Sequence, residues 1–159
     1  MSYMKNGFKF NEIEAMLPIY VKDKGNCTEI ITKDTSFIIN TTIETCTKNL
    51  ADYYNLSLYH NRLNYGKELG ISNKVPLVIN ENTVYVYINV REPMFNHDAA
   101  FGIVDINAVN SLYEEDGRAV VMLNSGKIIK TRQSLKSVKR NMLNARLAKD
   151  IYKERHNKI

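Results

Sequence analysis

An alternation of residue types between Val84 and Asn89 constrains the fold of this chain more than any other feature. Branched apolar residues at positions 84, 86 and 88 alternate with Tyr85, Tyr87 and Asn89. A two-residue period is that of a β-strand, in which successive side chains point to opposite faces of a sheet. One face of this strand is therefore expected in the core, and the other is expected to carry the aromatic residues.

Further short apolar runs, each bounded by turn residues, predict the other strands. They lie at Glu12–Leu17 ending at Pro18, Thr28–Thr32, Ser36–Asn40, Leu77–Ile79, Phe101–Ile106, Val109–Tyr113, Ala119–Leu123 and Lys127–Thr131. Turns at Lys33-Asp34 and Asn124-Ser125-Gly126 each join two of these runs, which is typical of β-hairpins. Since a hairpin pairs its strands antiparallel, mostly antiparallel strands are expected.

Helix signals occupy three segments. Thr41-Thr42-Ile43-Glu44 has the spacing of a capping box, and Ile43, Cys46 and Leu50 then mark one buried face as far as about Tyr54. A second helix is expected from Ser57 to Leu69, ended by Gly70 and followed by an extended Lys74-Val75-Pro76. A last helix begins at Ser134 and runs to about Arg155. The predicted class is α+β, with mostly antiparallel strands, two mid-chain helices and a basic amphipathic C-terminal helix, in a single domain covering residues 1–159.

Positive charge is concentrated at the C-terminal end of the chain. The formal net charge is +5, but Lys127–Ile159 holds 11 bases against 2 acids, or +9, whereas the preceding 126 residues carry −4. Clustered Lys and Arg attract phosphates and release their counterions, so this asymmetry indicates a polyanionic partner, either nucleic acid or an anionic membrane surface. A solvated basic helix without any partner is the alternative that charge alone leaves open.

The predicted last helix has two rows of apolar residues. The first row is Leu135, Val138, Met142, Ala145 and Tyr152, and the second is Leu143, Leu147 and Ile151. Two rows require two surfaces to cover them. The first is expected to pack on the sheet, and the second on either a partner chain or another part of the same chain. Basic residues stand between the rows, so the helix has cationic flanks that can bind phosphates.

Motifs of catalysis, cofactor binding and metal binding are missing from the sequence. It has no GxxxxGK(S/T), GxGxxG, GxSxG or HExxH, its three histidines are far apart, and Cys27 and Cys46 lack the spacing of a zinc site. No enzyme, metal or cofactor is therefore expected. The two cysteines are expected to be reduced and half-buried, although a disulfide between them is an alternative that the sequence leaves open. The acidic run Glu114-Glu115-Asp116 before Gly117 is interpreted as a turn.

Hydropathy gives an expectation for location. The apolar runs are far shorter than the ~20 residues of a membrane-spanning helix, and the N-terminal Met-Ser-Tyr-Met-Lys-Asn lacks the apolar stretch of a signal peptide. A cytoplasmic protein that does not enter a membrane is therefore expected.

A series of short segments follows the order and spacing of a known family. The segments are Leu17-Pro18, Ile30-Ile31 to Asp34, Phe37 to Asn40, Cys46, Tyr59 to Arg62, Lys74 to Ile79, Val84 to Ile88, and Asn124-Ser125-Gly126-Lys127 followed by Ser134 and Asn141. From Glu14 to about Ala148 the chain resembles the competence transcription factors (ComK) of Gram-positive bacteria. It departs from their pattern at Asn61, where they have a glycine, and at Phe101-Gly102-Ile103, where they have a tryptophan.

The resemblance implies a transcription activator of genes for DNA uptake. It implies binding of AT-rich double-stranded DNA through the minor groove by an oligomer of the chain, with bending of the DNA. Narrow AT tracts attract Arg and Lys, which agrees with the basic C-terminal segment. The residues predicted to contact DNA are Arg62, which matches the family, and Lys130, Arg132, Lys136, Lys139, Arg140, Arg146 and Lys149. A proteolytic adaptor is a further partner that the family's longer tail implies, but only a few residues follow the last helix here.

Two other functions stay open from the sequence. The short tail and the two-rowed last helix also fit a ComK-like protein that does not bind DNA by itself and joins a full-length activator in mixed oligomers. An enzyme acting on nucleic acid fits the charge alone, but metal-dependent nucleases need converging carboxylates, and the acids here are scattered along the chain.

Overall fold

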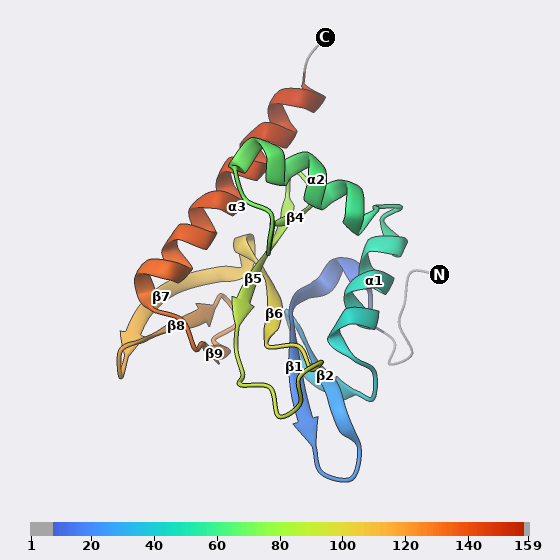
Figure 1. The fold of residues 1–159 in the computed structure, drawn as a ribbon, viewed down its shortest axis with the longest axis vertical. Helices are drawn as coiled ribbons and strands as arrows, with labels where there is room; N and C mark the ends of the chain where they lie inside the picture. Colours follow the sequence, from blue (N-terminus) through green and yellow to red (C-terminus); the bar gives the residue numbers. More distant parts are fainter. Residues whose placement is uncertain (1–7, 158–159) are drawn as a thin grey trace.

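Residues 8–157, which the structure describes, fold into two antiparallel sheets and three α-helices (Figure 1). The structure is a computed structural model. Its elements are η1 (Phe10–Glu12), β1 (Ile13–Val21), β2 (Gly25–Thr32), β3 (Ser36–Ile39), α1 (Ile43–Tyr53), α2 (Leu58–Leu69), β4 (Leu77–Asn80), β5 (Thr83–Asn89), β6 (Phe101–Asp105), η2 (Ile106–Ala108), β7 (Val109–Glu115), β8 (Arg118–Leu123), β9 (Ile128–Lys130) and α3 (Leu135–His156). The predicted α+β class with mostly antiparallel strands is confirmed.

The large sheet has the strand order β3-β2-β1-β6-β5-β4, and the small sheet has the order β7-β8-β9. Both predicted hairpins are present, since β2 pairs with β3 and β8 pairs with β9. In the large sheet β6 lies between β1 and β5 and joins the N-terminal hairpins to β4 and β5. It pairs with β1 at Ala15 and Met16, so the seam between these two groups of strands is short.

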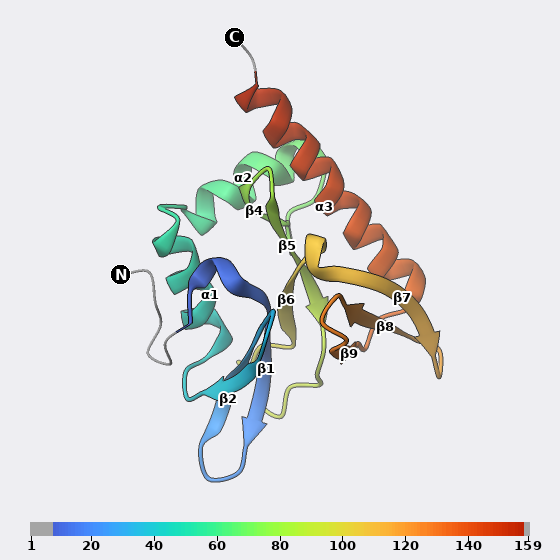
Figure 2. The ribbon, with the colours of Figure 1, turned by 180° about the vertical axis from the view of Figure 1, so that it is seen from behind.

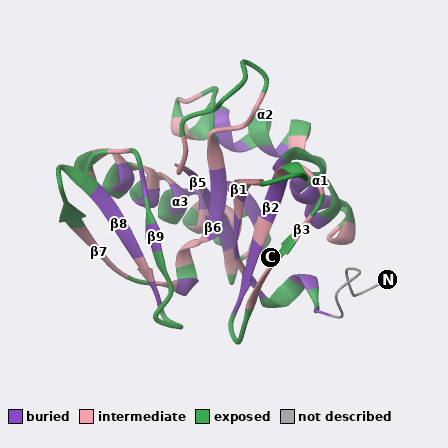
Figure 3. Ribbon diagram, turned by 90° about the horizontal axis from the view of Figure 1, so that it is seen from below, coloured by how far each residue is buried: buried purple, intermediate pink, exposed green. Residues whose placement is uncertain are grey.

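Both faces of the large sheet are buried in hydrophobic clusters (Figure 3). The face that carries Val84, Val86 and Ile88 packs against α3 and the small sheet, which lie side by side in Figure 2. The opposite face carries Tyr85, which is 1% exposed and packs in the cluster that α1 covers. The predicted aromatic face of β5 is therefore a second core, and the hydroxyl of Tyr85 donates a hydrogen bond to the Ile13 carbonyl at 2.8 Å.

The end of the first strand and the start of the first helix differ from the prediction, and β2 begins earlier, at Gly25 rather than Thr28. The first strand does not end at Pro18 but continues to Val21, paired with β2 along its length. β6 pairs with β1 only as far as Met16, so Pro18 lies where the strand has a partner on one side, the position in which a sheet tolerates proline. The N-cap of α1 is Thr42 rather than Thr41: its hydroxyl accepts a hydrogen bond from the Thr45 amide at 3.4 Å, so Glu44 does not complete a capping box.

Two local predictions also need correction. Lys74 is not extended, because its φ of +54° lies in the left-handed region that disfavours residues other than glycine. Cys27 and Cys46 are both fully buried rather than half-buried. They are free thiols, as expected, and burial raises the pKa of Cys46. The predicted turn at Glu114-Glu115-Asp116 is shifted, since both glutamates belong to β7 and the turn is formed by Asp116 and Gly117, each with positive φ.

Candidate nucleic-acid interface

The long helix α3 presents most of the basic residues that the sequence singled out. Ser134 caps it as predicted, with its hydroxyl accepting a hydrogen bond from the Ser137 amide at 3.1 Å. Lys153, Arg155 and His156 occupy the last turn, where positive charge is favourable to the helix dipole. Val138, Met142, Ala145 and Ala148 are buried against the β-sheets, which fixes the rotation of the helix about its axis. Side chains on its other side are therefore held in one orientation toward solvent.

Four of the predicted DNA-contacting residues share the exposed side of α3. They are Lys136, Lys139, Arg140 and Arg146. Their successive spacings of three, one and six residues keep them on one half of the helix surface. Within the described chain, no hydrogen bond or ion pair joins their charged groups to another residue. These cations are thus fully available to an anionic partner.

The two predicted contacts ahead of α3 are both paired with acids. The Nζ of Lys130 lies 3.7 Å from a carboxylate oxygen of Glu115, and a guanidinium nitrogen of Arg132 lies 3.4 Å from Glu92. Such exposed ion pairs are weak and screened by salt, so a phosphate can displace them, but they lower the local positive charge. The basic surface is therefore centred on α3 rather than on β9.

Lys149 and Arg155 lie away from the exposed row of bases. Lys149 is half-buried, and its charge lowers the pKa of Asp105, although burial of that carboxyl has the larger effect and raises the pKa to about 6. Arg155 donates hydrogen bonds to Asn64 at 2.8 Å and Glu68 at 3.2 Å, and so ties the end of α3 to α2. Arg155 therefore helps to hold the helix in place on the protein.

The second apolar row of α3 is split. Ile151 packs against the core, but Leu143 and Leu147 are 56% and 53% exposed. They are one helical turn apart and lie among the four unpaired bases. Leu143 lies between Arg140 and Arg146, and Leu147 directly follows Arg146. The exposed side of α3 is therefore both cationic and partly apolar.

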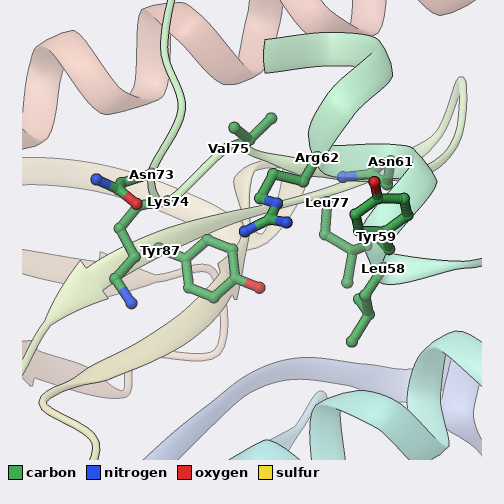
Figure 4. Close-up of a pocket in the computed structure, with 9 residues that line it drawn as sticks. All are labelled: Leu58, Tyr59, Asn61, Arg62, Asn73, Lys74, Val75, Leu77 and Tyr87. Atoms are coloured by element: carbon green, nitrogen blue, oxygen red, sulfur yellow. The ribbon is translucent and has the colours of Figure 1, made fainter.

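Arg62 is separated from all the other predicted contacts. It extends from α2 into a hollow of about 400 Å³ that is also lined by Tyr59, Lys74, Leu77 and Tyr87 (Figure 4). Leu77 and Tyr87 belong to the α1 side of the large sheet, whereas α3 covers the opposite face. A contact surface on α3 does not include Arg62. Sequence reasoning missed Lys74 at this hollow, because no local pattern links it to a residue on the preceding helix.

Within residues 8–157, no group of three or more His, Cys, Asp or Glu side chains is arranged to hold a metal ion. No helix in that range is long and apolar enough to cross a membrane.

Comparisons with known proteins do not assign the chain to a family. No protein-family model matches the chain, and no curated protein matches it. One solved structure is similar, the LytTr DNA-binding domain of a putative methyl-accepting/DNA response regulator from Bacillus cereus, with 13% sequence identity and a TM-score of 0.39 over 89% of this chain and 92% of that chain. A similarity this distant carries no conclusion about the fold or the function of the present protein.

Proposed function

We propose that this protein is a DNA-binding transcription regulator that acts as a single ComK-like domain in the cytoplasm. Its targets in this proposal are AT-rich promoters of DNA-uptake genes, which an oligomer contacts through the minor groove. The observation that carries the proposal is the exposed row of unpaired bases on α3, held rigidly by the buried face of the same helix. The competence assignment rests on the ordered segments between Glu14 and Ala148 alone.

The rigid geometry favours duplex DNA over a nonspecific polyanion. A helix of 22 residues is about 33 Å long, so its Lys and Arg side chains can follow a phosphate backbone over several base pairs. Arg side chains in fixed positions suit a narrow minor groove, whose negative potential is strongest in AT tracts. Lys130 and Arg132 extend the same surface once DNA phosphates replace Glu115 and Glu92.

A duplex titration at two salt concentrations tests this proposal. AT-rich duplex is expected to bind more tightly than GC-rich duplex, with affinity falling steeply as salt rises. Arg140→Ala and Lys139→Ala are each expected to weaken binding and to reduce the slope of log K against log salt by about 0.9 for each phosphate that the variant no longer neutralises. Lys67→Ala is the matched control, because Lys67 is exposed on α2 and does not belong to the row of unpaired bases on α3. Absence of any shift at low salt, or an equal weakening in the control, contradicts the proposal.

A second candidate is a protein that lacks independent DNA binding and joins a longer competence-type activator in mixed oligomers. The exposed Leu143 and Leu147 favour it, because apolar side chains at the centre of a helix surface are typical of an interface. It predicts weak DNA binding by the chain alone and altered DNA binding by the activator when the two are mixed. Replacing both leucines with glutamine is expected to abolish that alteration; an activator whose binding is unaffected by the wild-type chain argues against this candidate.

A further inference from the structure

The hollow around Arg62 has the features of an anion site. Its nine lining residues include Arg62 and Lys74 but no acid. Among the described residues, neither cation forms an ion pair, and both lie near aromatic rings instead: Arg62 is 5.6 Å from the centre of the Tyr59 ring. Two unpaired cations in one concavity favour an anionic ligand, and the planar fork of Arg with the point charge of Lys is a common phosphate-binding pair.

Lys74 is held in this position by an unfavourable backbone conformation. Its φ of +54° is costly for a lysine, and strain of this kind is concentrated at functional sites. The conformation places Nζ 4.6 Å from the centre of the Phe101 ring and 5.6 Å from that of Tyr87. The ammonium group therefore lies at the boundary between this hollow and a neighbouring one of about 270 Å³, which shares Leu58, Lys74 and Tyr87.

The rest of the hollow suits a flat, apolar ring. Leu58, Val75 and Leu77 line it, and Tyr59 is 57% exposed, so that its ring is free to stack. In Figure 4 the Arg62 side chain lies between Tyr59 and Tyr87, and Lys74 lies on the other side of the Tyr87 ring. The volume of about 400 Å³ is within the range of small-ligand sites. Glu44 lines the neighbouring hollow, which places the anionic part of a ligand on the Arg62 side.

We propose that this hollow binds a nucleotide, with the phosphate on Arg62, Lys74 adding positive charge at the edge of the hollow, and the base against Tyr59 and the apolar wall. The nucleotide is either a free mononucleotide or one unit of a single strand, since both present a base beside a phosphate. None of the α3 bases lines the hollow, so the site is separate from the duplex surface and does not depend on it.

Calorimetric titration of the whole chain tests the site with AMP, adenosine, inorganic phosphate and a short oligo(dT). AMP is expected to bind at least about tenfold more tightly than adenosine, which lacks the phosphate, or than inorganic phosphate, which lacks the base. Arg62→Gln is expected to weaken AMP binding about tenfold, because it removes a charge-assisted hydrogen bond. Lys74→Gln is expected to weaken it several-fold, because it removes the second positive charge at the hollow. Tyr59→Leu is expected to weaken it several-fold because the base then has no ring to stack on. Lys67→Gln, an exposed lysine on the same helix, is expected to change nothing.

The oligo(dT) arm identifies the source of the nucleotide. Tighter binding of oligo(dT) than of AMP, abolished in Arg62→Gln, supports a single strand, whereas AMP binding that oligo(dT) does not displace supports a free nucleotide. The proposal is overturned if neither probe binds at millimolar concentration, if phosphate alone binds as tightly as AMP, or if the Arg62 and Lys74 variants bind AMP like the wild type.

Discussion

At the scale of single residues, the carboxyl of Asp105 has a pKa raised from 3.8 to about 6. Burial is the largest cause; the hydrogen bond from the Asn107 amide lowers the pKa, Glu14 raises it and Lys149 lowers it. Burial also raises the pKa of Glu14, and Glu14 and Asp105 line one hollow, separate from the one around Arg62. A group of two carboxyls that resist ionisation therefore lies where η2 joins the large sheet to the small one.

Stability is expected to depend on the proton at Asp105. Because the folded-state pKa of about 6 is above the unfolded value, the folded protein binds more protons between these two pH values. The free energy of unfolding is therefore expected to rise as pH falls from 7 toward 4, by at most about 3 kcal/mol from this group, less the effect of solvent screening. Asp105→Asn keeps an oxygen that accepts the Asn107 amide and is expected to flatten this dependence, as measured by urea unfolding at several pH values.

A conservative control separates Asp105 from the other acids. Asp116→Asn changes an exposed residue in the turn before Gly117, at a positive φ that asparagine tolerates. It is expected to leave the pH dependence unchanged. An Asp105→Asn protein whose stability rises on acidification as much as that of the wild type contradicts the assignment.

At the scale of elements, the N-cap of α1 gives a direct test of the observed register. Thr42→Ala removes the hydroxyl that accepts the Thr45 amide and is expected to lower the free energy of unfolding by about 1 kcal/mol. Thr41→Ala is the matched control, because Thr41 takes part through its backbone carbonyl, which accepts the Thr28 hydroxyl at 2.7 Å. Chemical denaturation of both variants decides whether Thr42 or Thr41 caps the helix. A larger destabilisation by Thr41→Ala supports the capping box that the sequence predicts.

The same helix start shows what sequence patterns resolve and what they do not. Caps, glycine stops and apolar periods are local, so α2 and α3 begin and end within about a residue of the expected positions. Thr41 and Thr42 are both good caps, and the sequence alone does not decide between them. The exposed bases of α3 follow from its period, but the presence of Arg62 and Lys74 at one hollow depends on how α2 packs over β4, which no local pattern encodes.

At the scale of the whole molecule, one hydrophobic cluster joins the two sheets and α3. It contains Val86 and Val104 of the large sheet, Val121 of the small sheet, and Met142 and Ala145 of α3. The basic row of α3 is therefore fixed relative to both sheets, and loosening either sheet is expected to loosen the proposed DNA surface. We expect the molecule to unfold in one cooperative transition, in which circular dichroism and tyrosine fluorescence report the same midpoint.

The pairing of β1 with β6 leaves no space for an added side chain at Gly102. A Cβ added at Gly102 lies 2.5 Å from the carbonyl oxygen of Met16 and 2.8 Å from Cδ2 of Leu17. Gly102→Ala is therefore expected to destabilise the protein by about 1 to 3 kcal/mol, as crowding in a packed interior does, and to lower the midpoint of the whole transition. The double variant Gly102→Ala with Leu17→Ala removes the side-chain clash but not the backbone one. The reference is Leu17→Ala alone, because Leu17 packs against the core and its truncation is itself destabilising. A double variant as stable as Leu17→Ala contradicts a backbone origin for the strain; a double variant less stable than Leu17→Ala supports it, because strands β1 and β6 then remain too close for any side chain at this position.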